Sequence, residues 1–235
     1  MISRAPFDRF LTLASGLLRP AWGQGRVRWG LLYGLTCHLV FAAAIGAMIY
    51  AMFFGLSKGI GQVPWPWALL ANLALILQFP LGHSLLLSRR VRAVLEALAP
   101  KAHAKTLSTS TYAIIASLQL LALFIFWTPS GIIWFEAQGP FFAVICVAYG
   151  ISWLLLALSI YEAGVELQSG ALGWMSLVQN IPVKFPDMPT GGLFRLIRQP
   201  IYVAFAVTLW TVPVWTPDQL ALALLWTAYC LLAPI

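Results

Sequence analysis

Six apolar stretches, separated by short polar or charged segments, dominate the pattern of this chain. A helix that crosses a bilayer needs about 20 mostly apolar residues. The stretches approach or exceed that length, and they lie at residues 29–56, 67–87, 112–127, 141–160, 201–215 and 220–235. Only residues 216–219 separate the last two, which predicts a tight helical hairpin. The pattern therefore predicts an all-α, polytopic membrane protein with about six transmembrane helices.

The composition favours the same class of protein. Of the 235 residues, 61% are hydrophobic and only 9% are charged, whereas a soluble domain carries about 25% charged residues. The three cysteines, Cys37, Cys146 and Cys230, all lie inside apolar stretches. We expect them to be small core residues, with no disulfide framework and no metal site.

The distribution of lysine and arginine predicts the orientation in the membrane. Counting the segments between the apolar stretches, 13 of the 14 basic residues fall on one side, and Lys58 alone falls on the other. The positive-inside rule then places both termini in the cytoplasm, and we expect a bacterial inner membrane. The net charge of +7 does not indicate binding to nucleic acid, because the basic residues flank apolar stretches instead of forming a stripe on a soluble face.

Two polar segments on the cytoplasmic side are expected to be structured. We divide the chain into a basic N-terminal arm, residues 1–28, and a single transmembrane domain, residues 29–235. Within that domain, residues 88–99 predict a short basic amphipathic helix at the membrane surface. Residues 162–202, called the elbow below, are long for a membrane loop and are expected to lie along the interface. The pattern indicates a lipid bilayer as surroundings and gives no oligomeric state.

The last part of the elbow, Gly191–Tyr202, lies where the chain re-enters the membrane, and we call it the signature segment. Arg195 and Arg198 are three residues apart, so on one helical turn they would face the same way. Pro200 disfavours a helical conformation at the preceding residue, so an extended or bent backbone is expected there. A charged, bent segment at a bilayer surface is a candidate for function.

Other polar residues admit two interpretations each. Glu162 and Glu166 have helical i, i+4 spacing, which favours a solvated helix face; the alternative is a site for a cation or a ribose hydroxyl. His83 is an ionisable group near the end of a span, and such groups are functional candidates. Alternatively its ring bonds a backbone group that Pro80 leaves free. His38 is expected to be a hydrogen-bonded core residue.

The signature segment resembles the R-H-P-x-Y pattern of the isoprenylcysteine carboxyl methyltransferase and phospholipid methyltransferase superfamily. It is most similar to the branch that contains bacterial methanethiol S-methyltransferases and NnrU-like membrane proteins. Four further pieces are similar to elements of that branch and occur in the same order: His83-Ser84 followed by Arg89-Arg90, then Ser110-Thr111-Tyr112, then Phe126-Trp127, and the turn from Trp210 to Pro217.

The resemblance implies methyl transfer from S-adenosylmethionine to an acceptor. That acceptor would be a small thiol, a carboxylate or a lipid headgroup, and the cofactor would enter from the cytosol. By position, the resemblance assigns catalytic roles to Arg198, Gln199 and Tyr202. It implies no metal site. It assigns cofactor binding to a wider set of residues: Gly192, Phe194, Arg195, Arg198, Gln199, Pro200, Tyr202 and His83.

The sequence departs from the family pattern at two places. Gln199 stands where the family has histidine, and glutamine can exchange hydrogen bonds but cannot shuttle a proton. The family also has an acidic pair after its final hairpin, and the 235 residues stop at Ile235, where that pair would begin. Two alternatives therefore stay open: an NnrU-like, haem-binding isomerase that uses His83 as an axial ligand, and a non-catalytic membrane accessory protein.

Overall fold

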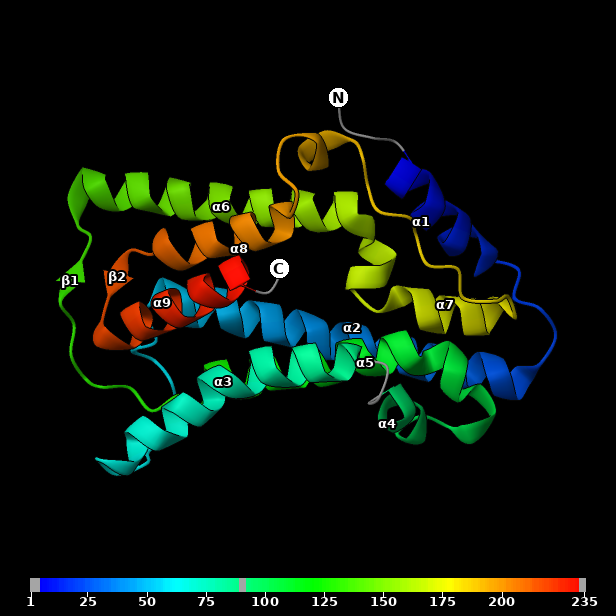
Figure 1. Cartoon of the computed structure of the whole chain (residues 1–235), viewed down its shortest axis with the longest axis horizontal. Coiled ribbons are helices and arrows are strands. Elements are labelled where there is room, and N and C mark those ends of the chain that lie inside the picture. Colours follow the sequence, from blue (N-terminus) through cyan, green and yellow to red (C-terminus); the bar gives the residue numbers. More distant parts are fainter. Residues whose placement is uncertain (1–4, 89–91, 233–235) are drawn as a thin grey trace. The chain divides into compact units, whose positions relative to one another are not determined.

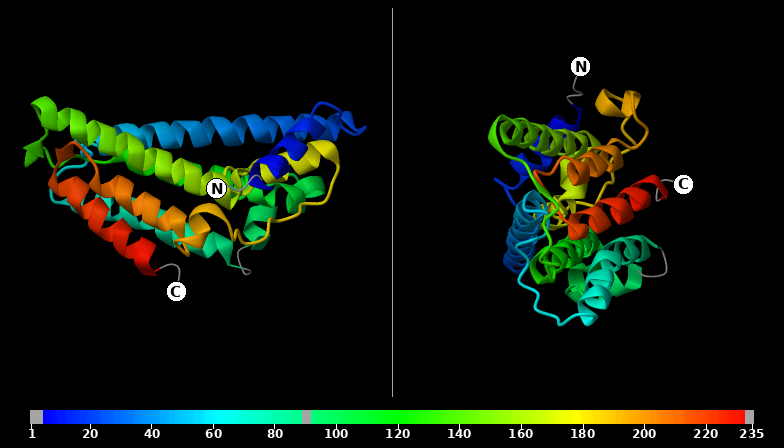
Figure 2. Two further views of the ribbon diagram at one scale, coloured as in Figure 1. Left: turned by 90° about the horizontal axis from the view of Figure 1, so that it is seen from above. Right: turned by 90° about the vertical axis from the view of Figure 1, so that its left-hand side faces the viewer.

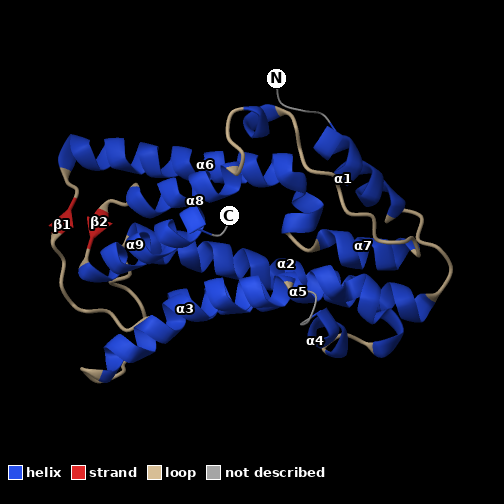
Figure 3. Cartoon of the chain, in the orientation of Figure 1, coloured by secondary structure: helices blue, strands red, loops and turns tan. Residues whose placement is uncertain are grey.

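The computed structural model describes residues 5–88 and 92–232, and within them helices joined by loops make up the chain, together with two short strands (Figures 1 and 3). Arg89, Arg90 and Ile235, used above, lie outside the described residues. In chain order the elements are α1 (Ala5–Gly16), α2 (Gln24–Phe53), α3 (Trp67–Leu87), α4 (Arg92–Ala97), η1 (Lys101–His103), α5 (Ala104–Phe126), β1 (Phe135–Glu136), α6 (Gly139–Gln168), α7 (Ala171–Gln179), η2 (Gly192–Arg195), α8 (Pro200–Trp210), β2 (Val214–Trp215) and α9 (Pro217–Leu232).

Among the described residues, four helical stretches are long and apolar enough to cross a membrane, and the two C-terminal helices are shorter. The four are Gln24–Phe53, Trp67–Leu86, Lys101–Phe126 and Gly139–Gln168. The predicted all-α, polytopic membrane fold is therefore confirmed. The described chain divides into two compact units. Unit 1 holds Met1–Ala43, Leu81–Leu118 and Ile160–Arg195, and unit 2 holds Ala44–Pro80, Gln119–Ser159 and Leu196–Ile235.

The predicted C-terminal hairpin is present in unit 2, but its first helix is shorter than expected. α8 and α9 pack side by side (Figures 1 and 2). α8 has 11 residues, about 16 Å at 1.5 Å per residue, whereas the hydrocarbon core of a bilayer is about 30 Å thick. The predicted span 201–215 is too long because the helix ends at Trp210. Beyond it, β2 pairs antiparallel with β1, with Trp215 opposite Phe135.

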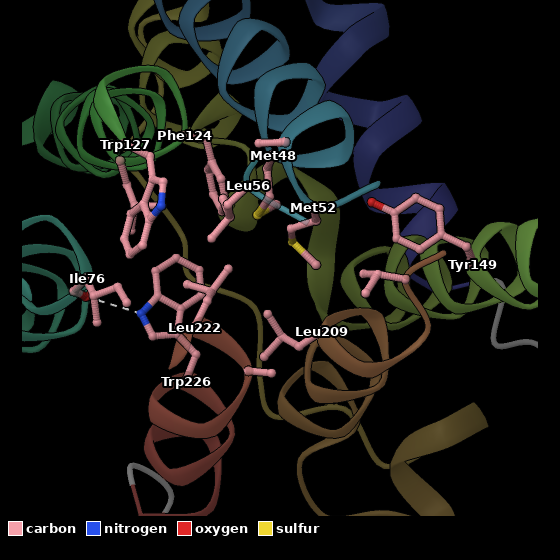
Figure 4. Close-up of a cluster of buried hydrophobic side chains, with 14 residues drawn as sticks. Met48, Met52, Leu56, Ile76, Phe124, Trp127, Tyr149, Leu209, Leu222 and Trp226 are labelled. Carbon is pink, nitrogen blue, oxygen red and sulfur yellow. Dashed lines mark hydrogen bonds between the residues drawn. The ribbon is translucent and has the colours of Figure 1, made fainter. Parts of the chain in front are cut away.

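Helix α3 runs without a break through Pro80, although a proline inside a helix usually kinks or breaks it. Proline has no backbone N–H, so the carbonyl of Ile76, four residues earlier, has no partner within the helix. In unit 2 the indole Nε1 of Trp226, from α9, donates a hydrogen bond to that carbonyl oxygen at 3.2 Å (Figure 4). A side chain from another helix thus replaces the bond that Pro80 cannot make.

The core of unit 2 is built around the same tryptophan. Trp226 is 1% exposed, and its ring lies 5.4 Å from that of Phe79 and 5.5 Å from that of Phe205, between ring centroids. Figure 4 shows side chains from α2, α3, α5, α6, α8 and α9 converging on this cluster, which includes Met48, Met52, Leu56, Leu123, Leu209 and Leu222. Their apolar contacts hold the hairpin against the longer helices.

In unit 1, α1 lies along α7 and covers its apolar face (Figures 1 and 2). The buried residues are Ala99, Leu107, Ala171, Trp174, Met175, Leu177 and Val178, and Phe10, Leu13 and Leu17 of the N-terminal arm pack against them. Two glycines of α2 allow α7 to approach closely: an added Cβ would meet Val178 at Gly30 and the ring of Trp174 at Gly34. The N-terminal arm is therefore part of the core of unit 1.

Arg26 fixes the C-terminal end of α7. Its guanidinium donates hydrogen bonds to the backbone carbonyls of Leu177 and Val178, and also to those of Ala21 and Trp22 in the loop before α2. The last carbonyls of a helix lack partners within it and carry a partial negative charge, so a cation there is favourable.

Of the surface helix predicted at 88–99, the described residues contain α4, Arg92–Ala97, which ends two residues before the predicted end. Leu95 is buried, whereas Val94 and Leu98 are exposed. An amphipathic helix gathers its apolar side chains on one face, so a buried Leu95 beside an exposed Val94 and Leu98 agrees with the predicted amphipathic character only in part.

Candidate active site

The elbow begins where α6 changes direction. Gly164 has φ 101° and ψ 89°, which is not helical, and it lies between Glu162 and Glu166. Residues at i and i+4 share a face only on a regular helix, so this glycine separates the two carboxylates. The predicted solvated face is wrong, because Glu162 is 3% exposed and Glu166 is 1% exposed.

The carboxylate of Glu166 is paired with the N-terminal arm. Arg9 Nε lies 2.9 Å from Glu166 Oε1. The same guanidinium lies close to Gly164, where an added Cβ would be 3.0 Å from Arg9 Nη2 and 3.4 Å from Cγ of Pro186. The remaining atoms Arg9 Nη2 and Glu166 Oε2 are buried and make no hydrogen bond among the described residues. Helix α1, the end of α6 and the elbow thus meet at this ion pair.

The carboxylate of Glu162 holds the elbow on the other side of the break. The backbone N–H of Leu193, in η2, donates a hydrogen bond to Glu162 Oε2 at 2.6 Å. Gly192 precedes it with φ 59°, a left-handed conformation, and an added Cβ would collide with the Glu162 carboxylate. A glycine is required at this position for both reasons.

The signature segment is a short 3-10 turn followed by a bend and a helix. Gln199 has φ −133° and ψ 70°, and Pro200 is the first residue of α8, so the non-helical backbone predicted before the proline, extended or bent, is confirmed. Arg195 ends η2, whereas Arg198 lies in the bend, so the prediction that both lie on one helical turn is wrong. Both side chains are exposed, and neither makes a hydrogen bond or ion pair within the described ranges.

The residues predicted for the site fall in both units. Unit 1 contains His83 and, in one turn of 3-10 helix, Gly192, Phe194 and Arg195. Unit 2 contains the remaining ones, at the start of α8 or just before it: Arg198, Gln199, Pro200 and Tyr202. Pro200 is buried, whereas Phe194, Gln199 and Tyr202 are half-buried.

His83 and His38, the two histidines in predicted membrane helices, both have aromatic partners. The hydroxyl of Tyr112 lies 2.6 Å from Nδ1 of His83, so one partner of this ring is a side chain of α5. The indole Nε1 of Trp174 donates to Nε2 of His38 at 3.1 Å, which confirms the hydrogen-bonded core role predicted for His38. The three cysteines are free, and no group of three potential metal ligands occurs in the part of the chain that the structure describes.

An apolar cavity of about 330 Å³ lies in unit 1 between α2, α5 and the end of α4. Its lining is Leu32, Tyr33, Thr36, Leu98, Thr111, Ile114 and Ile115. Leu32 and Leu98 are more than half exposed, so the cavity is open on one side. No pattern in the sequence indicates this cavity.

Arg9 and the buried state of both glutamates were also missed from the sequence. A glycine between two glutamates at the end of an apolar stretch, with an arginine in the N-terminal arm, was the available signal. It was weak, because 157 positions separate the paired Arg9 and Glu166.

Comparison with known proteins finds relatives over most of the chain. A methanethiol S-methyltransferase of a Pseudomonas species is 28% identical over 209 residues, which are 86% of this chain and 78% of that protein. Methanethiol S-methyltransferase 1 of Bradyrhizobium diazoefficiens is 28% identical over 206 residues, 84% and 70% of the two chains. Nurim of Xenopus laevis is 27% identical over 201 residues, 76% and 68% of the two chains.

No family profile matches the chain, and no solved structure matches it either. The similarities to methanethiol S-methyltransferases and nurim agree with the isoprenylcysteine methyltransferase-like superfamily, and they confirm the resemblance found from the signature segment.

Proposed function

We propose that this protein is an integral membrane methyltransferase that uses S-adenosylmethionine to methylate a small thiol. The observation that carries the proposal is the 28% identity to a methanethiol S-methyltransferase over 86% of the chain. A match that long has to include the elbow up to Pro200, wherever along the 235 residues it begins. The part of the chain that carries the signature is therefore within the similarity.

The residues of the signature segment fit the chemical groups of this cofactor. S-adenosylmethionine carries a carboxylate, a ribose, an adenine ring and a sulfonium cation. The exposed guanidinium groups of Arg195 and Arg198 have no partner among the described residues, and arginine binds carboxylates in a two-pronged geometry. The rings of Phe194 and Tyr202 are half-buried, and an aromatic face attracts a nearby cation by about 0.5–2 kcal/mol.

The chemistry suits a chain that lacks a histidine at position 199. When bound, S-adenosylmethionine supplies a methyl group on a positively charged sulfur; a thiolate forms the new C–S bond as the old one breaks, and both charges are neutralised. Exclusion of water strengthens the attraction between the two charged reactants and holds them in line. Gln199 would position the acceptor by hydrogen bonds, and the thiol would have to lose its proton to solvent before transfer.

A small, uncharged thiol is the acceptor that we favour among the three classes implied by the resemblance. The two bacterial relatives described above are named for methanethiol, and a small thiol needs no long channel for an acyl or prenyl chain. Such a thiol would partition into the bilayer and reach the protein from there.

Purified protein in detergent tests the proposal. We expect binding of S-adenosylmethionine in the micromolar to low millimolar range and formation of dimethyl sulfide from methanethiol. An absence of binding at millimolar cofactor, with folded protein, would count decisively against the methyltransferase. A protein that then co-purified with a partner would favour the accessory role.

The haem-binding alternative gains no support from a specific observation. His83, its candidate ligand, is hydrogen-bonded to Tyr112, and Gln199 is a poor ligand for haem iron. A Soret absorption band in the purified protein would nevertheless revive it.

A further inference from the structure

Glu162 makes a contact that the methyltransferase signature does not include. Its carboxylate accepts the backbone N–H of Leu193 at 2.6 Å, and the side chain is 31 positions away in sequence. Phe194 and Arg195 follow Leu193 directly in the same 3-10 turn, and all of these residues belong to unit 1. The contact therefore fixes the backbone that carries two of the proposed cofactor-binding side chains.

The cost of burying the Glu162 carboxylate has to be offset by its contacts. Burying an ionised carboxylate without partners is costly, and hydrogen bonds from backbone N–H groups stabilise the charged form. Glu162 is 3% exposed, and Leu193 supplies such a bond. Gly192 makes the approach possible, because an added Cβ would occupy the space of the carboxylate. The sequence of the turn and the buried acid are thus matched to each other.

The other end of the contact is also held. Gly164 turns the chain two residues after Glu162, and Pro186 lies against it. Two residues further on, Glu166 is tied to Arg9 of α1 by the ion pair at 2.9 Å. Glu162 therefore projects from a fixed point, so the position of its carboxylate determines where the turn lies.

We propose that Glu162 is a positioning residue that sets the 3-10 turn of Phe194 and Arg195 for binding of S-adenosylmethionine. The proposal rests on the proposed function, because it assigns the turn to the cofactor. It predicts that cofactor affinity depends on the hydrogen bond from Leu193 and not on the negative charge. Glutamine at position 162 retains a carbonyl oxygen that can accept this bond, whereas alanine does not.

Three variants separate these possibilities. E162A should lose hydrogen–deuterium exchange protection at 193–195 and weaken S-adenosylmethionine binding about tenfold, as expected for the loss of one charged hydrogen bond. E162Q should restore the protection and bind within about threefold of the wild type. Ser159→Ala is the matched control. Ser159 is also buried, one turn earlier on α6, but its hydroxyl bonds only its own helix at Leu155, so neither readout should change.

The readouts distinguish the two proposals. Unchanged exchange at 193–195 in E162A would overturn the contact, and lost protection with unchanged cofactor affinity would overturn the positioning role. If the wild type itself does not bind the cofactor, the proposed function fails, while the exchange comparison still reports whether Glu162 holds the turn. Should E162A not fold, E162D serves in its place: it keeps the charge but withdraws the carboxylate by one methylene, and it should behave as E162A does.

Discussion

At the scale of single residues, the end of α6 depends on side chains that lie far apart in the sequence. Glu162 and Glu166 would share one solvated face on an unbroken helix. The non-helical backbone of Gly164 separates them, so each carboxylate has a different partner. One of these partners is backbone and the other is the guanidinium of Arg9. Substitutions of Glu162 and of Glu166 are therefore expected to have different effects.

Arg9→Ala is expected to lower the free energy of unfolding by about 1–2 kcal/mol. Removing one partner of a buried ion pair costs about 3–5 kcal/mol, but the side chain of Arg9 is 39% exposed, so solvent screens part of the loss. Denaturant unfolding in detergent measures the effect. Arg19→Ala, an exposed arginine of the same arm, is the control and should change stability little. Adding Glu166→Gln to Arg9→Ala should recover most of the loss, and a further loss would contradict the ion-pair explanation.

Arg195→Ala and Arg198→Ala should behave in the opposite way. Both side chains are exposed and make no contact that stabilises the fold among the described residues, so unfolding should be unchanged. If they bind the cofactor carboxylate, each substitution should weaken S-adenosylmethionine binding about tenfold or more, measured by calorimetry. Lys184→Ala, an exposed cation elsewhere in the elbow, should leave binding intact. Equal effects of all three would indicate a general effect of charge.

At the scale of helices and strands, prediction succeeded where a long apolar run was the only signal. The predicted stretch 67–87 coincides with α3, and α6 begins two residues before the predicted 141. α5 begins eight residues before the predicted 112, because hydroxyl groups make its polar first turns compatible with a helix. Thr111 bonds the carbonyl of Leu107, and Ser110 bonds that of Gly170 in unit 1. Such bonds depend on neighbours, which periodicity does not report.

In the signature segment too, local geometry could be predicted from the sequence, whereas a turn that depends on a distant residue could not. The non-helical backbone of Gln199, before Pro200, followed from proline geometry alone. The 3-10 turn at Gly192–Arg195 did not follow, because it is stabilised by a carboxylate 31 positions earlier. The assignment of its residues to a cofactor remains a prediction that binding experiments must test.

Trp226→Phe should destabilise unit 2 by about 1–3 kcal/mol, because it leaves the carbonyl of Ile76 buried without a donor while keeping a ring in the core. Thermal unfolding in detergent measures this loss. Trp210→Phe removes the same type of donor from an exposed bond to Thr227 and should cost less. Pro80→Ala restores the missing N–H of α3, so in that background Trp226→Phe should cost distinctly less. Independent, additive effects would contradict the replacement of the helix bond by the indole.

At the scale of the whole molecule, the distribution of charge predicts the orientation in the membrane, which the arrangement of the helices does not determine. Lys58 alone was placed opposite the other 13 basic residues, and the positive-inside rule turns this asymmetry into an orientation with both termini in the cytoplasm. Among the described residues, four helices are long enough to cross a membrane and two shorter ones form the hairpin of α8 and α9, and this even number is compatible with that orientation whether or not the hairpin crosses fully. The orientation itself stays a prediction.

Labelling from outside the cell tests this orientation. Lys58→Cys and Lys101→Cys replace exposed residues that the charge pattern assigns to opposite sides. A membrane-impermeant maleimide added to intact cells should label position 58 and leave position 101 unlabelled until the cells are opened. Labelling of position 101 alone would invert the topology. The unaltered protein serves as the blank, because Cys37 and Cys230 are buried and Cys146 is half-buried.

The packing of α1 on α7 has a practical consequence for the handling of this protein. Phe10, Leu13 and Leu17 shield apolar side chains of α7, among them Met175 and Val178. A shortened version that started after Gly16 would lack Phe10 and Leu13, and it would expose the strip of apolar side chains on α7 that these two residues cover. Such a strip invites aggregation during purification. Affinity tags are therefore better attached with a flexible spacer ahead of α1 than substituted for it.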